Sequence, residues 1–206
     1  MFAYSFMQRA LIAIILLGII LPIIGLNMTT KRLSMIGDTL SHTSLCGIAL
    51  GLAAGTMPTV WAIGVSIVAG IIIEIVRNHF KKYSELTLSI VMSTAVGVAG
   101  ILTSKWASGN KIESYLFGSL ITVQWDSIWI IIGVSIITIL FNLIFYRTIM
   151  YTSYSESEAR ISGVPVKAMN LINTILVACV VAVASSIIGA LLVSSLLVIP
   201  VARALQ

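Results

Sequence analysis

Charged residues are scarce in this sequence. Of its 206 residues only 9% are Asp, Glu, Lys or Arg, whereas 59% are hydrophobic. A soluble domain carries about 25% charged residues, because its surface must face water. The composition therefore excludes a soluble globular protein and predicts a polytopic membrane protein. The net charge of +5 fits membrane topology and anionic lipids, and it gives no indication of nucleic-acid binding.

Cysteines and catalytic motifs are also scarce. The only two cysteines, Cys46 and Cys179, both lie in apolar runs, which excludes a disulfide framework and a zinc knuckle. The sequence has no Walker A loop, no His-Glu-x-x-His pattern and no set of nucleophile, base and orienting residue. We therefore expect a protein that is not an enzyme and that holds no tightly bound cofactor.

Long apolar runs fill most of the chain. Five of them approach the roughly 20 residues that cross a bilayer, and the last region is about 50 Å long as a helix, which exceeds one span. Breaks are expected at Ser185, Ser186 or Gly189 and again near Pro200. The fold class is all-α, a transmembrane bundle of about six to seven membrane segments. The expected helices cover residues 9–28, 38–55, 58–77, 86–104, 127–147 and the region from 168 onward.

Two segments allow other interpretations. The first apolar run follows Arg9 as a signal peptide would, but it continues to Leu26 without an Ala-x-Ala cleavage site, which favours a retained helix. The run from Tyr115 to Ile121 is too short to span, so it is expected to be a re-entrant or interfacial piece. Trp125 and Trp129 beside it suit a membrane boundary.

The basic residues predict the orientation. With the N-terminus outside, the cytoplasmic loops would hold eight Lys and Arg residues and the outer segments only three, as the positive-inside rule requires. The eight are Lys31, Arg32, Arg77, Lys81, Lys82, Arg147, Arg160 and Lys167. The polar loop 147–167 is therefore expected in the cytoplasm.

Asp38 and His42 are the best candidates for chemistry. They lie four residues apart, so on a helix they share one face with Cβ atoms about 6 Å apart. Each ionisable residue inside a membrane costs roughly 3 kcal/mol, so such a pair needs a partner or an ion. A carboxylate and a neutral imidazole suit zinc, manganese or iron. The alternative is structural, with Asp38 capping the helix and His42 bonded to a carbonyl.

Ser41 and Cys46 on the same helix are candidates for lining a pathway. Cys46 lies about 12 Å from Asp38 along the helix axis, too far for both to bind one ion, and a small buried residue is its alternative role. Glu74 and Asp126 are expected to be boundary residues.

The cytoplasmic segment 155–165 predicts a short capped helix, since acidic residues stand in its first turn and Gly163 and Pro165 end it. A short helix at the cytoplasmic end of a bundle is also a surface to which a partner protein could bind. The alternative is a plain surface loop. The candidate docking residues are Glu156, Glu158, Ala159, Arg160 and Gly163.

Four segments, taken in order along the chain, resemble one known family. The sequence is similar to the metal-ion ABC transporter permeases, the zinc, manganese and iron importers of bacteria. The segments are Gly-Asp-Thr-Leu-Ser-His at 37–42, Tyr-Leu-Phe-Gly-Ser at 115–119, Ala-Arg-Ile-Ser-Gly-Val-Pro-Val at 159–166 and Ile-Gly-Ala-Leu-Leu-Val-Ser-Ser-Leu-Leu-Val-Ile-Pro at 188–200.

The resemblance implies a permease in the cell membrane that forms a homodimer, receives a metal from an extracytoplasmic binding protein and is driven by cytoplasmic ABC ATPase subunits. It places Asp38 and His42 on the metal pathway and the 155–165 segment on the coupling helix. The transported zinc, manganese or iron would be cargo. ATP hydrolysis would belong to the partner.

The chain departs from the family pattern in three places. Cys46 stands where proline is common, the coupling segment matches only loosely through Glu156 and Glu158, and the chain stops at Gln206, where family members continue. We therefore expect residues 1–206 to form a single permease domain that lacks the C-terminal helices. Two other functions stay open: an ion-coupled secondary transporter that relays protons through the Asp–His pair, and a truncated fragment that does not transport.

Overall fold

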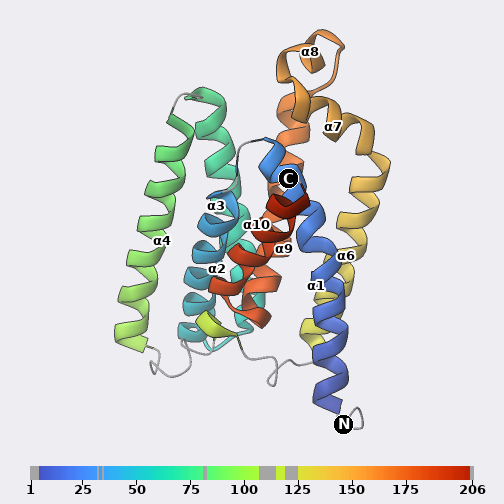
Figure 1. Cartoon of the computed structure of the whole chain (residues 1–206). Helices are drawn as coiled ribbons and strands as arrows, with labels where there is room; N and C mark the ends of the chain where they lie inside the picture. Colours follow the sequence, from blue (N-terminus) through green and yellow to red (C-terminus); the bar gives the residue numbers. More distant parts are fainter. Residues whose placement is uncertain are drawn as a thin grey trace.

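The computed structural model describes residues 5–31, 33, 35–80, 83–106, 115–118 and 125–204, and within these ranges all regular structure is helical. The helices form one bundle (Figure 1). Their bounds are α1 Ser5–Thr30, α2 Met35–Ala53, α3 Pro58–His79, α4 Ser84–Trp106, α6 Trp125–Ile144, α7 Tyr146–Tyr154, α8 Glu156–Ile161, α9 Val166–Ile188 and α10 Ala190–Ala204.

Five helices in the described part are long and apolar enough to cross a membrane. They are α1 from Met7 onward, α3, α4 to Ser104, α6 and α9, while α10 contributes a shorter apolar helix. The predicted fold class, an all-α polytopic bundle, is confirmed. α2 is not one of these five helices because Asp38, His42 and several hydroxyl residues interrupt its apolar sequence.

α2 is the inner helix of the bundle. It packs against α3, α4, α9 and α10, and 13 of its 19 residues are buried. Its buried hydroxyls bond to carbonyls of the same helix: Thr39 to Met35, Ser41 to Gly37 and Thr43 to Leu40. Ser44 also meets the hydroxyl of Ser185 on α9. The buried hydroxyl residues of α2 are therefore satisfied inside protein, which is where a membrane bundle tolerates them.

α2 and α3 approach backbone to backbone. A Cβ atom at Gly47 would lie 2.6 Å from the carbonyl oxygen of Trp61 and 2.7 Å from the Cα of Ala62. Only glycine permits this contact, and small residues at helix interfaces are the usual means of close packing in membranes. The position of α2 in the bundle therefore depends on Gly47.

The last apolar region breaks at Gly189, one of the predicted positions. Gly189 has φ +97°, and from there α10 turns back along the bundle (Figure 1). A Cβ at Gly189 would lie 2.6 Å from the carbonyl oxygen of Leu116, so the short 115–118 segment sits directly against the break. The second break expected near Pro200 is wrong: α10 continues through Pro200 to Ala204. Proline is tolerated inside membrane helices because neighbouring helices and local adjustments satisfy the freed backbone group.

The segment 115–118 lies within the bundle, as the prediction of a re-entrant piece requires. Tyr115 and Leu116 pack against Leu45 and Ala49 of α2. Residues 119–121 of the predicted piece lie outside the described residues.

The predicted helix over 127–147 ends at Ile144, and α7 and α8 follow it at the end of the bundle opposite the N-terminus (Figure 1). The short capped helix expected near 155–165 is present as α8. The Ser155 hydroxyl accepts a hydrogen bond from the Glu158 backbone N–H, and Gly163, with φ +81°, follows the helix end.

Replacing Gly47 by alanine should destabilise the protein by about 1 to 3 kcal/mol, the usual cost of overpacking, because the new methyl group would meet the α3 backbone. The measurement is thermal unfolding of purified protein in detergent. Gly64→Ala is the matched control, since a Cβ at Gly64 has no neighbour within 4 Å and alanine is the better helix former. Equal melting temperatures for the two variants would contradict the close approach of α2 and α3.

Candidate functional site

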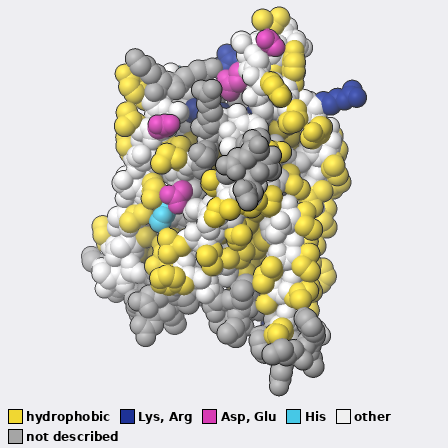
Figure 2. Space-filling view, in the orientation of Figure 1, with side chains coloured by type: hydrophobic (Ala, Val, Ile, Leu, Met, Phe, Trp, Pro, Cys, Tyr) yellow, Lys and Arg dark blue, Asp and Glu magenta, His cyan; other side chains and the backbone are white. Residues whose placement is uncertain are grey.

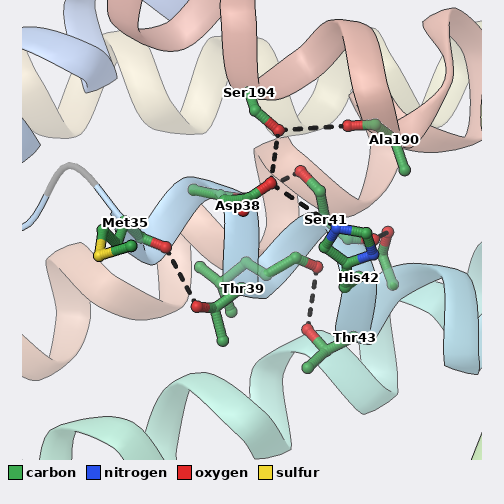
Figure 3. A network of polar contacts seen from close by, with 11 residues as sticks. Met35, Asp38, Thr39, Ser41, His42, Thr43, Ala190 and Ser194 are labelled. Atoms are coloured by element: carbon green, nitrogen blue, oxygen red, sulfur yellow. Dashed lines mark hydrogen bonds and ion pairs between the residues drawn. The ribbon is translucent and has the colours of Figure 1, made fainter. Parts of the chain in front are cut away.

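The centre of the candidate site is the Asp38 and His42 pair on α2. His42 Nε2 lies 3.7 Å from Asp38 Oδ1, and the two side chains are 18% and 42% exposed, respectively. Both project from one side of the first turns of α2 (Figure 3). The predicted sharing of one helical face is confirmed, and the geometry allows both groups to reach a common ligand.

A third polar group meets the pair from another helix. The Ser194 hydroxyl of α10 donates a hydrogen bond of 2.9 Å to Asp38 Oδ1 (Figure 3). Sequence reasoning assigned no role to Ser194, although the 188–200 segment contains it. No spacing rule could connect residues 156 positions apart. The only signal was a serine pair within an apolar helix.

The pair lies partway along the bundle and is partly exposed on its side. Asp38 and His42 belong to the first turns of α2, and α2 starts short of the end of the bundle that carries α8 (Figure 1). On the face shown in Figure 2, hydrophobic side chains cover much of the described surface, and the visible Lys and Arg side chains lie toward the α8 end. The sequence left this depth open. Since such a position is costly for ionisable groups, the pair is suited to a transport function.

His42 lines a cavity of about 260 Å³ between α2 and α4. Its walls are mainly apolar, and Leu116 of the 115–118 segment contributes to them. The other lining residues are Leu45, Ala49, Val96, Ala99, Gly100 and Thr103. The His42 imidazole and the Thr103 hydroxyl are therefore the polar side-chain groups that a small cation in this cavity would meet.

The pair supplies two ligands. Among the residues that the structure describes, no group of three or more His, Cys, Asp and Glu side chains could hold a metal ion. A cation at Asp38 and His42 would need further ligands, such as water or groups of another chain.

Ser41 and Cys46 have other neighbours. Ser41 is fully buried, and its hydroxyl donates to the Gly37 carbonyl oxygen at 2.8 Å. Cys46 is buried against Ala95 and Ala99 of α4. Their role in lining a pathway stays a prediction.

Glu74, which the sequence suggested as a boundary residue, lies near the end of α3 and is buried inside the protein. It is 1% exposed, and its carboxylate accepts hydrogen bonds from Arg77 at 2.8 Å, Asn78 at 3.2 Å and Thr174 of α9 at 3.4 Å. A buried charge needs such partners. The i, i+3 spacing of Glu74 and Arg77 was visible in the sequence, but the contribution of α9 was not.

A second polar chain links α8 to the end of α1. Lys31 Nζ donates to Asn170 Oδ1 at 2.6 Å, and Asn170 Nδ2 donates to Glu156 Oε1 at 3.1 Å. Burial, with a smaller contribution from the nearby Arg77 guanidinium, lowers the pKa of Lys31 to about 8, although Glu156 and Glu74 oppose the shift. Glu156 of the predicted docking set thus faces the bundle.

The remaining docking candidates fall into two groups, one buried and one exposed. Ala159 is fully buried, whereas Glu158, Arg160 and Gly163 are exposed. Two apolar side chains that sequence reasoning missed stand out beside them: Tyr154 is 89% exposed and Ile161 is 88% exposed. Such residues at the end of a membrane bundle suit contact with another protein.

A bundle of membrane-crossing helices around a polar inner helix defines a multi-pass membrane transport protein. The chain belongs to the ABC 3 transport family, whose model matches residues 3–206. It is therefore a permease subunit of the ABC transporter class, located in the cell membrane, as the sequence resemblance predicted.

Similar proteins of known name align with nearly the whole chain. A Treponema pallidum protein named "Probable metal transport system membrane protein" is 34% identical over 100% of this chain and 77% of its own length. The manganese import system permease protein ScaB of Streptococcus gordonii is 30% identical over 98% and 72%. The high-affinity zinc uptake system membrane protein ZnuB of Haemophilus influenzae is 29% identical over 98% and 77%.

A solved structure has the same fold. PsaBC from Streptococcus pneumoniae, in complex with Fab, matches with a TM-score of 0.84 at 28% identity, covering 98% of this chain and 73% of that one. Family membership favours an ATP-driven transporter over the ion-coupled alternative.

The lowered pKa of Lys31 should make stability depend on pH. Between about pH 8 and 10.5 the unfolded chain binds a proton that the folded chain has released, so the free energy of unfolding should rise with pH in this window. Lys31→Met and Lys31→Arg should both lack this contribution, since neither side chain releases a proton there. Thermal unfolding in detergent across this range tests it, and curves parallel to the wild type would contradict it.

Proposed function

We propose that this chain is the membrane-spanning subunit of an ATP-driven importer of divalent transition metal ions and that Asp38 and His42 contact the ion in transit. The observation that carries the proposal is the carboxylate and imidazole, 3.7 Å apart on the polar inner helix. Relatives named for manganese and zinc support it. Carboxylate and imidazole suit manganese, zinc and iron alike, so the pair alone does not select among them.

The chemistry of the pair suits transient binding. A carboxylate adds negative charge and a hard oxygen, and a neutral imidazole adds a nitrogen ligand. With two protein ligands the ion keeps part of its water shell and is released readily. Asp38 remains 42% exposed on the side of the bundle, so a second copy of the chain in a homodimer would supply further ligands there.

The ATPase partner would dock at the end of the bundle that carries α8. This chain has no Walker A loop of its own. Glu158, Arg160 and Gly163 present a polar surface on α8 and just beyond it, with Tyr154 and Ile161 as exposed apolar anchors. Interfaces concentrate their binding energy in such large side chains. Glu156 and Ala159 would instead hold α8 on the bundle.

Residues 1–206 would act as one permease domain, and an extracytoplasmic binding protein would deliver the metal at the end that carries the N-terminus. The positive-inside distribution of Lys and Arg supports this orientation. The cavity between α2 and α4 would form part of the route. Iron as cargo and Ser41 and Cys46 as pathway residues stay predictions.

Asp38→Asn and His42→Gln should each reduce metal uptake at least tenfold, since each removes a ligand of the passing ion. The measurement is uptake of radioactive Mn²⁺ and Zn²⁺ by cells that lack their own importers, with permease abundance checked by immunoblot. Asp126→Asn is the matched control because Asp126 is an exposed carboxylate at the start of α6. Wild-type uptake by both site variants at normal abundance would refute the pathway role.

Ile161→Ser and Glu158→Lys should weaken co-purification of the ATPase subunit without lowering the amount of permease in the membrane. The apolar anchor and the acidic contact of α8 would be lost, whereas the fold would not change because both side chains are exposed. Met57→Ser is the control, an exposed apolar residue at the opposite end of the bundle. Full retention of the ATPase by both α8 variants would argue against docking at α8.

A further inference from the structure

We infer that Ser194 of α10 is a positioning residue of the metal contact: its hydroxyl holds the Asp38 carboxylate in the orientation that the passing ion requires. This inference rests on the proposed function, because it needs Asp38 to contact the ion. It adds a second helix to a site that the sequence placed entirely on α2.

The first step of the argument is the hydrogen bond itself. Ser194 Oγ donates to Asp38 Oδ1 at 2.9 Å, and His42 Nε2 approaches the same oxygen at 3.7 Å. Both neighbours therefore act on Oδ1. A hydrogen bond to one carboxylate oxygen restricts rotation about the Cβ–Cγ bond, so it also restricts the direction of the other oxygen.

The second step is that Ser194 is committed to Asp38 rather than to its own helix. Serines inside helices usually donate to a carbonyl three or four residues earlier. Ser195 does so, with a bond of 2.8 Å to the Leu192 carbonyl oxygen. Ser194 lies 3.4 Å from the Ala190 carbonyl oxygen, half an ångström farther than from Asp38. Its shorter and stronger contact is the one across the helix interface.

The third step is that the backbone carrying Ser194 is held firmly. Val193 and Leu197 on either side of it are buried in the main core cluster. A Cβ at Gly37, the residue before Asp38, would lie 3.0 Å from Leu197 Cδ1. α10 thus packs closely against the first turn of α2, and the Ser194 hydroxyl is presented to the carboxylate at a set distance.

The start of α10 is fixed by the 115–118 segment. Gly189 has φ +97° and Gly118 has φ +80°, and the two backbones touch where any side chain would collide. Leu116 of the same segment lines the cavity that His42 faces. The 115–118 segment and α10 therefore contact both members of the pair. Ser194 of α10 binds Asp38, and Leu116 forms part of the cavity wall beside His42.

A partner that orients a metal ligand typically contributes 10-fold to 100-fold in affinity or activity. Losing the Ser194 hydroxyl leaves the carboxylate in place but free to rotate. The effect should therefore appear in the metal concentration that half-saturates transport. It should not appear in the amount of protein in the membrane.

The experiment compares Ser194→Ala, Ser194→Thr and Ser195→Ala in cells that express the complete transporter with its ATPase. Initial rates of radioactive Mn²⁺ uptake are measured over a range of concentrations, with permease abundance determined in parallel. Ser194→Ala should raise the half-saturating Mn²⁺ concentration about tenfold and leave the maximal rate per permease nearly unchanged. Ser194→Thr, which keeps the hydroxyl, should restore most of the affinity, and Ser195→Ala should match the wild type.

Two results would overturn the inference. One is a Ser194→Ala variant with the half-saturating concentration of the wild type, and the other is a loss confined to abundance or maximal rate that threonine does not rescue. Asp38→Asn in the same assay separates this failure from a failure of the proposed function. If Asp38→Asn abolishes uptake while Ser194→Ala does not affect it, only the positioning role is refuted; if neither matters, the pathway role itself is refuted.

Discussion

A polar group within a membrane is costly unless the protein supplies a partner, and in this chain many such groups lie on α2. The helix carries a carboxylate, an imidazole and four hydroxyl residues in its first ten positions. It is enclosed by α3, α4, α9 and α10, and its hydroxyls bond to its own carbonyls or to Ser185. The more apolar helices surround α2 and face the lipid, so they separate its polar groups from the hydrocarbon.

Close backbone contacts make that enclosure possible. Gly47 brings α2 onto α3, and Gly118 and Gly189 bring the 115–118 segment onto the break between α9 and α10. Without a hydrophobic driving force between helices in lipid, such contacts and a few interhelical hydrogen bonds supply much of the specificity. The same contacts place Ser194 against Asp38, so packing and the candidate transport site share one cause.

At the α8 end of the bundle, a polar chain connects surface and interior. Glu156 on α8 is linked through Asn170 of α9 to Lys31 at the end of α1, and α2 starts only four residues later. A movement of α8 would therefore be transmitted through these hydrogen bonds to Lys31, which precedes α2, the helix that carries Asp38. Buried polar networks of this kind also fix a unique arrangement of helices, since each broken bond leaves a costly group.

Much of this was accessible from the sequence. Low charge and long apolar runs predicted the all-α membrane bundle, and the four-residue spacing predicted that Asp38 and His42 share a face, because both properties are local. Four motifs in order predicted the family. Local pattern did not predict the burial of Glu74, the continuation of α10 through Pro200 or the exposure of Tyr154 and Ile161.

The sequence by itself determined the class of environment, the main apolar helices and the candidate pair on α2. Only the tertiary structure decided which helices meet, and with that the Ser194 contact, the cavity beside His42 and the inward direction of Glu156. The physical reason is that composition and helical period act over a few residues. A hydrogen bond between residues 38 and 194 exists only once a glycine break and close helix packing have brought α10 against α2.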